Sequence, residues 1–171
     1  MAARISSLVL LAAALFALAV AGADGEGSKK VIVAVGGLVS CQDCSTAGTW
    51  DLAGAKPLPG AKLSITCKDH RRRVVLYKAA AADDNGYVFA ELYTTTMRGG
   101  YFDPVEACTA RLLVSPEERC SVATDVNGGA QGAQLRYENT TLAGQFADID
   151  VYVVGPLAFR PANCQPKTTQ S

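Results

Sequence analysis

Six cysteines are the residues of this sequence with the widest choice of chemistry. They are Cys41, Cys44, Cys67, Cys108, Cys120 and Cys164. The first two enclose Gln42 and Asp43, and this Cys-x-x-Cys spacing occurs in zinc sites and in redox-active dithiols. The sequence has no second pair with this spacing, and its single histidine, His70, is not at ligand spacing from the first. A disulfide framework is therefore favoured over metal or redox chemistry, provided that the compartment is oxidising.

The N-terminal residues predict such a compartment. Arg4 precedes an uninterrupted apolar run from Leu8 to Ala21, and small residues suited to a signal peptidase accompany its end. A run of about 14 residues is shorter than the roughly 20 that span a bilayer, so we expect a cleaved signal peptide over residues 1–23 and no membrane insertion. A flexible segment over residues 24–30 is expected to follow. Three disulfides are then predicted, but six cysteines allow many pairings and their spacing does not choose among them.

A short basic cluster lies between two strand-like segments. Its members are Lys68, His70, Arg71, Arg72 and Arg73, interrupted only by Asp69. A solvated turn is one interpretation. The other is a cationic patch that binds a polyanion, such as de-esterified pectin or another acidic glycan, because arginine pairs with carboxylates in a bidentate way.

The overall charge excludes one class of ligand. The chain carries 16 Lys and Arg against 16 Asp and Glu, so it lacks the surplus of cations that nucleic-acid binding requires. Cleavage after residue 23 removes Arg4 and leaves 15 basic residues against 16 acidic ones. The basic cluster thus belongs to an otherwise balanced surface, and we expect no nucleic-acid partner.

The sequence gives little indication of a catalytic site. A Ser-His-Asp arrangement would need His70, which lies in the basic cluster, and no Gly-x-Ser-x-Gly motif occurs. Two carboxylate pairs exist, Asp83 with Asp84 and Asp148 with Asp150. The first pair belongs to a turn sequence and the second to the start of a predicted strand. We therefore expect no enzymatic activity, no cofactor and no metal.

Two further features concern sugars. Asn139-Thr140-Thr141 is an acceptor motif for N-glycosylation in a polar stretch, so Asn139 is a candidate glycan site. Trp50 and the tyrosines are candidates for a surface on which sugars stack, although aromatic side chains of β proteins are more often buried.

Short strands and turns must position these groups. β-Branched runs and period-two alternation predict strands over residues 31–35, 61–68, 73–77, 86–93, 108–114, 135–138 and 149–154. Gly36 and Gly37 are expected to end the first strand, and residues 79–82 to form one helical turn. About seven strands without a long amphipathic helix indicate an all-β fold, a single antiparallel sandwich or barrel over residues 31–164. Residues 165–171 are predicted to be a disordered tail.

Several motifs together resemble one family. They are GGLVSCQDC (36–44), PLPGA (57–61) before Cys67, CTARL (108–112) with Cys120, and GPLAFRP (155–161) before Cys164. In order and flanks they are similar to the plant pollen-allergen and extensin family, named after the major olive-pollen allergen. The resemblance covers nearly the whole predicted mature chain. It implies a secreted, usually glycosylated, disulfide-bonded β protein of the plant apoplast and cell wall, without assigned catalytic activity.

The resemblance also implies a disulfide pairing. Transferred to this chain, the pairs are Cys41 with Cys120, Cys44 with Cys164, and Cys67 with Cys108. The first two would clamp the end of the first strand to two distant segments.

Three functional hypotheses follow. The favoured one is a monomeric, non-enzymatic wall protein, acting in growth or tissue development by recognising wall polysaccharide (acidic pectin above all), a wall protein or a receptor ectodomain. A protease inhibitor that presents the loop from Val122 to Gly132 is the alternative. A wall-modifying hydrolase acting through Asp148 or Asp150 is least favoured.

Overall fold

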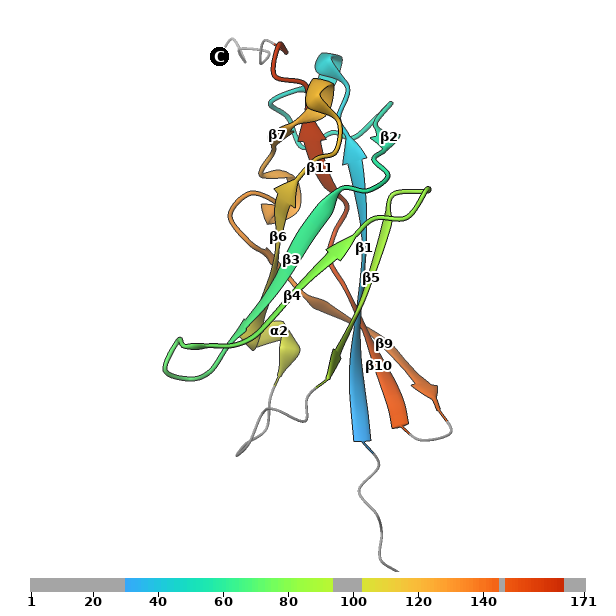
Figure 1. The fold of residues 1–171 in the computed structure, drawn as a ribbon, viewed down its shortest axis with the longest axis vertical. Coiled ribbons are helices and arrows are strands. Elements are labelled where there is room, and N and C mark those ends of the chain that lie inside the picture. Colours follow the sequence, from blue (N-terminus) through green and yellow to red (C-terminus); the bar gives the residue numbers. More distant parts are fainter. Residues whose placement is uncertain (1–29, 94–102, 145–146, 165–171) are drawn as a thin grey trace, which may run out of the picture.

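A computed structural model describes residues 30–93, 103–144 and 147–164 (Figure 1). Its strands are β1 (Lys30–Cys41), β2 (Lys56–Pro57), β3 (Lys62–Lys68), β4 (Val74–Ala81), β5 (Tyr87–Tyr93), β6 (Cys108–Val114), β7 (Val122–Ala123), β8 (Ala133–Gln134), β9 (Arg136–Ala143), β10 (Ala147–Val153) and β11 (Leu157–Arg160). Its helices are η1 (Cys44–Thr46), α2 (Pro104–Ala107), η3 (Glu118–Cys120) and η4 (Val126–Gly128). The predicted signal peptide, nearly all of the predicted segment 24–30 and the predicted tail lie outside the described residues. Among the helices described, none has the length and apolar character needed to cross a membrane.

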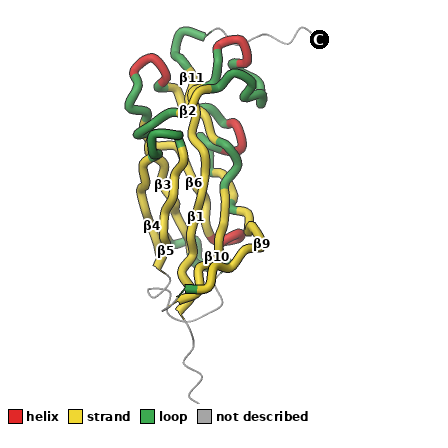
Figure 2. Tube along the Cα trace, turned by 90° about the vertical axis from the view of Figure 1, so that its right-hand side faces the viewer, coloured by secondary structure: helices red, strands yellow, loops and turns green. Residues whose placement is uncertain are grey.

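Two sheets enclose one core (Figure 2). The larger has the order β7-β11-β1-β10-β9, with β2 and β5 also paired to β1, and the smaller has the order β4-β3-β6-β8. The predicted all-β fold with three disulfides is confirmed. The antiparallel prediction needs one correction, because β1 runs parallel to both β10 and β11. These two strands lie end to end along β1, so the last part of the domain forms a sheet with the first.

β1 is the longest strand described and does not end at its glycines. It continues through Gly36 and Gly37 to Cys41. A Cβ at Gly37 would lie 2.6 Å from Cγ2 of Val154, so glycine provides room for that side chain while the strand continues. The N-terminal part of β1 pairs with β10 and β5, and its C-terminal part pairs with β11 and β2.

The core between the sheets is built from alternate residues of the strands. Val33 and Val35 of β1, Leu63 and Ile65 of β3, and Leu92 of β5 are all at most 4% exposed. Burying a side chain of this size stabilises the fold by about 1.5–3 kcal/mol. The period-two pattern predicted for residues 61–68 therefore reflects a strand with one face in this core.

The helical turn predicted over residues 79–82 is wrong. Ala79 to Ala81 continue β4, where Ala79 lies opposite Ser64 and Ala81 opposite Lys62. Ala82 then enters the core, at 8% exposed. Four alanines are too few to nucleate a helix, and the hydrogen-bonded ladder with β3 outweighs their helix propensity.

Three disulfides cross-link the chain. They join Cys41 with Cys120, Cys44 with Cys164, and Cys67 with Cys108, which are the pairs that the resemblance implies. None of the six cysteines is free, so Cys41 and Cys44 do not form a zinc-binding or redox dithiol. The bonds span 79, 120 and 41 residues, and in the chain-entropy model loops of such lengths each contribute about 4 kcal/mol.

Substitution of two glycines tests the packing at the junction of β1, β2 and β5, where Gly86 lies; Gly54, outside the junction, is the control. Gly86 and Gly54 have φ values of 81° and 74°, but a Cβ at Gly86 would lie 2.6 Å from the Val39 carbonyl oxygen, whereas one at Gly54 has 3.9 Å to its nearest neighbour. We expect Gly86→Ala to lower the free energy of unfolding by about 3 kcal/mol and Gly54→Ala by about 1 kcal/mol. Urea unfolding of the oxidised proteins measures both, and equal losses would contradict the packing described.

Candidate functional site

The basic cluster forms the turn that joins β3 to β4 (Figure 1). Asp69 organises this turn: its Oδ1 accepts hydrogen bonds from the backbone N–H groups of Arg71 and Arg73, both at 2.9 Å. Its Oδ2 accepts from Nε of Arg73 at 2.8 Å and lies 2.7 Å from Nη2 of the same side chain. Arg72 adopts a φ of 61°, which the tight turn requires.

These contacts divide the predicted polyanion-binding residues into two kinds. The guanidinium of Arg73 is held by Asp69 and serves the turn. Lys68, Arg71 and Arg72 are exposed and, within the described part of the chain, form no ion pair. His70 is exposed beside them. The turn thus presents three cations to solvent on a fixed backbone.

One carboxylate of each predicted pair has a structural contact. Oδ1 of Asp83 accepts from the backbone N–H groups of Asn85 and Tyr87, at 2.9 and 2.8 Å, and so shapes the turn before β5. Oδ1 of Asp150 accepts from the Thr141 hydroxyl at 2.7 Å, across the β9–β10 pair. Neither arrangement supports an acid and base pair.

Asn139 lies on β9 with its side chain exposed. Its φ of 55° coincides with the irregular register between β9 and β10. All eight residues of β9 are exposed, so the acceptor motif lies on an accessible edge of the larger sheet.

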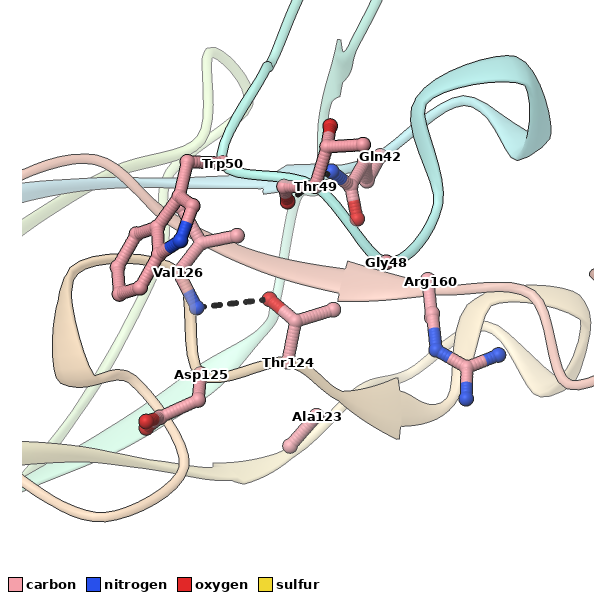
Figure 3. A pocket seen from close by; sticks show the side chains of 9 residues that line it. All are labelled: Gln42, Gly48, Thr49, Trp50, Ala123, Thr124, Asp125, Val126 and Arg160. Atoms are coloured by element: carbon pink, nitrogen blue, oxygen red, sulfur yellow. Dashed lines mark hydrogen bonds between the residues drawn. The ribbon is translucent and has the colours of Figure 1, made fainter. Parts of the chain in front are cut away.

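A pocket of about 340 Å³ is lined in part by residues of β7 and β11, and these strands lie near the opposite end of the molecule from the turn between β3 and β4 (Figure 1). It is formed by the loop that follows β1, by the segment from Ala123 to Val126, and by Arg160 of β11 (Figure 3). Trp50 belongs to this loop and Asp125 to the second segment. Disulfides tie these walls together, since Cys41 and Cys44 flank the start of the loop while Cys120 and Cys164 lie close to the other two segments.

Gln42 holds the loop in place. Its Nε2 donates to the backbone carbonyls of Thr46, Thr49 and Asp51 at 3.0, 3.1 and 2.8 Å. Asp43 adds a cap to η1, and hydrogen bonds from Ser45 to its side chain lower its pKa. Sequence reasoning missed Gln42 and Arg160 as pocket residues, because neither residue type in its local sequence signals a site that forms only when three distant segments meet.

The ionisation of Asp69 in the basic turn predicts how the stability of the fold depends on pH. Hydrogen bonds from Arg73, first from its backbone and then from its side chain, lower the pKa of Asp69. The ionised carboxylate is thus favoured in the folded state. Its stabilising contribution is full above the unfolded pKa of about 3.9 and is lost as the pH falls through the lower folded value.

We expect Asp69→Ala to lower stability at neutral pH and to flatten the loss of stability between about pH 5 and pH 2. Asp84→Ala is the control, because Asp84 is an exposed aspartate of another turn with no hydrogen bond in the described structure. Chemical unfolding at a series of pH values measures both variants. The same pH profile for the two would contradict the role assigned to Asp69.

Known proteins resemble this chain in sequence and in fold. No protein-family model matches it. Non-classical arabinogalactan protein 30 of Arabidopsis thaliana is 33% identical over 138 residues, which cover 77% of this chain and 54% of that protein. A pistil-specific extensin-like protein of Nicotiana tabacum is 28% identical over 142 residues, which cover 77% of this chain and 31% of that protein. The chain thus spans about half, or less, of these curated relatives.

A solved structure shares the fold. The major plantain pollen allergen Pla l 1 superposes with a TM-score of 0.56 at 23% identity, over 80% of this chain and 99% of the allergen. The chain is a homologue of the arabinogalactan and extensin-like plant proteins and has the fold of a pollen allergen, which is consistent with the family that its motifs resemble.

Proposed function

We propose that this protein is a secreted, non-enzymatic protein of the plant cell wall that binds acidic wall polysaccharide through the turn between β3 and β4. The names of its relatives, an arabinogalactan protein and an extensin-like protein, support the wall and extracellular part of the proposal. The ligand class comes from the turn itself.

Three exposed cations on a fixed turn carry the proposal. Lys68, Arg71 and Arg72 lie within five residues, and Asp69, the acid between them, is already paired with Arg73. A polymer with regularly spaced carboxylates can meet several of these cations at once. Each exposed pair contributes about 0.2–1 kcal/mol, so binding depends on their number and weakens with salt.

The other two hypotheses lack such support. Residues 122–132, the loop that a protease inhibitor would present, contain β7 and the wound turn η4, with Val126 buried. An inhibitory loop needs an exposed, extended backbone instead. An acid and base dyad needs both carboxylates of a pair, but one member of each pair is hydrogen-bonded within the protein, Asp150 to Thr141 and Asp83 to its own turn.

Retention on immobilised polygalacturonate tests the proposal. We expect the parent protein to bind at low salt and to elute as salt is raised, and methyl-esterified pectin to retain it poorly because its carboxyl groups are blocked. Replacing Lys68, Arg71 and Arg72 together by alanine should weaken binding about tenfold.

The control removes the same number of charges elsewhere. Lys56, Lys62 and Arg119 are exposed cations outside the turn, and their triple alanine variant should elute close to the parent. Equal loss in the two triple variants would show attraction to net charge only. Retention that persists without the turn cations would refute the turn as the binding site.

We also propose that Asn139 carries an N-linked glycan. It heads the one N-x-Ser/Thr motif of the sequence and is exposed on β9. For the protein secreted from plant cells, we expect treatment with an N-glycan-cleaving enzyme to increase gel mobility. Asn139→Gln and Thr141→Ala should abolish this change, whereas Thr141→Ser keeps the motif and should retain it. Unchanged mobility of the parent protein after treatment would disprove the modification.

A further inference from the structure

The pocket near the disulfide-bridged end contains a buried acceptor that the protein leaves unused. Gln42 is 1% exposed, and its Oε1 accepts no hydrogen bond from the described residues. The orientation of the amide is determined by its Nε2, which faces three backbone carbonyls at 2.8–3.1 Å. A flipped amide would place Oε1 against these carbonyl oxygens. Oε1 is thus a buried acceptor of a pocket-lining residue that has no donor among the described residues, and leaving it unpaired costs free energy.

An exposed aromatic side chain lies at the same pocket. Trp50 is 71% exposed and is the only tryptophan in the sequence. In Figure 3 its indole lies beside Val126, on the side of the pocket away from Arg160. An indole ring offers a rigid apolar face and an N–H donor. A ligand with one apolar face can therefore pack on Trp50 while its polar groups reach the other pocket residues.

The charges of the pocket are balanced. Arg160 donates from Nη1 to the Pro161 carbonyl at 3.2 Å and, among the described residues, forms no ion pair, so further N–H donors are available. The carboxylate of Asp125 accepts at 3.1 Å from both the backbone and the side chain of Gln131. One cation and one anion favour an uncharged ligand that has both donors and acceptors.

We propose that this pocket binds one neutral sugar residue of a glycan. A sugar hydroxyl donates to Oε1 of Gln42, another accepts from Arg160, and the C–H face of the ring packs on Trp50. A volume of about 340 Å³ lies at the small end of the roughly 300–1,000 Å³ typical of small-molecule sites. β7 and β11, which carry pocket residues, lie far from the basic turn in Figure 1, so this site does not depend on pectate binding.

Preorganisation supports the proposal. The three carbonyls held by Gln42 fix the loop that carries Trp50, and the Cys41–Cys120 and Cys44–Cys164 disulfides fix the loop to the other walls. The loop therefore has little conformational freedom left to lose on binding, and this lowers one of the free-energy costs of association.

Tryptophan fluorescence tests the site directly, because the only indole lies at the pocket. The full secreted chain is titrated with the methyl glycosides of glucose, galactose, mannose, xylose and arabinose, and with galacturonic acid as a charged comparison. We expect a saturable blue shift of the emission with at least one neutral glycoside, and a weaker response to galacturonic acid. In NMR spectra the side-chain amide of Gln42 and the indole N–H of Trp50 should shift together with it.

Variants define the contacts. Ligand-observed NMR should show binding weakened about tenfold in Trp50→Ala and in Arg160→Gln. Tyr87→Ala is the matched control, since Tyr87 is 60% exposed and lies outside the pocket, and it should bind like the parent. Circular dichroism and the absence of free thiols establish that each variant is folded and oxidised.

The proposal is overturned if no sugar shifts the Trp50 and Gln42 signals, or if Trp50→Ala binds as tightly as the parent. Failure here is distinguishable from failure of the pectate proposal. The variant lacking Lys68, Arg71 and Arg72 should keep the sugar response, and Trp50→Ala should keep salt-sensitive retention on polygalacturonate.

Discussion

The fold depends on two covalent ties at the end of β1. Cys41 ends this strand and Cys44 begins η1, yet their bonds reach 79 and 120 residues along the chain. Both bonds act on the same few residues, so they hold the first strand, η3 and the C-terminal part of the domain at one point. The parallel ladders of β1 with β10 and β11 join the same distant parts of the chain. Such long-range pairing is entropically costly for a free chain, and the cross-links reduce that cost.

This arrangement gives the molecule two ends with different physical properties. At the β3–β4 turn, charge is presented on a short hairpin whose backbone is set by one carboxylate, and attraction there is long-ranged and screened by salt within about 10 Å. At the disulfide end, charge is balanced, and a buried amide and an indole from the loop after β1 lie at the same pocket as a guanidinium from β11. The first surface suits a repeating polymer of one charge. The second suits a single small unit with defined hydroxyl positions.

The fold was predictable where local pattern and tertiary environment agree. Residues 61–68, 86–93 and 108–114 alternate because one face of each strand enters the core, and all three predicted strands are present. The sequence pattern gave a wrong prediction of secondary structure where one residue type has two structural uses. Gly37 provides space for Val154 inside a continuous strand, and the alanines after Lys78 extend β4. The strand from Leu157 to Arg160 was not predicted, because four residues between two prolines carry no periodic signal and gain their ladder from β1.

Residue type and spacing were enough to identify the core strands, the basic cluster and the acceptor motif at Asn139, because each of these features is local in the chain. The disulfide pairs were implied only by the resemblance, which rests on the order of motifs along nearly the whole predicted mature chain. Only the tertiary structure decided that Arg73 serves the turn while Lys68, Arg71 and Arg72 face solvent, that β1 is flanked by parallel strands, and that Gln42, Trp50 and Arg160 share a pocket. The role of Arg73 depends on how the turn folds around Asp69, and residue type alone does not show which cation of the cluster the carboxylate binds. The parallel strands and the pocket depend on which distant segments meet, and a single sequence does not reveal such contacts.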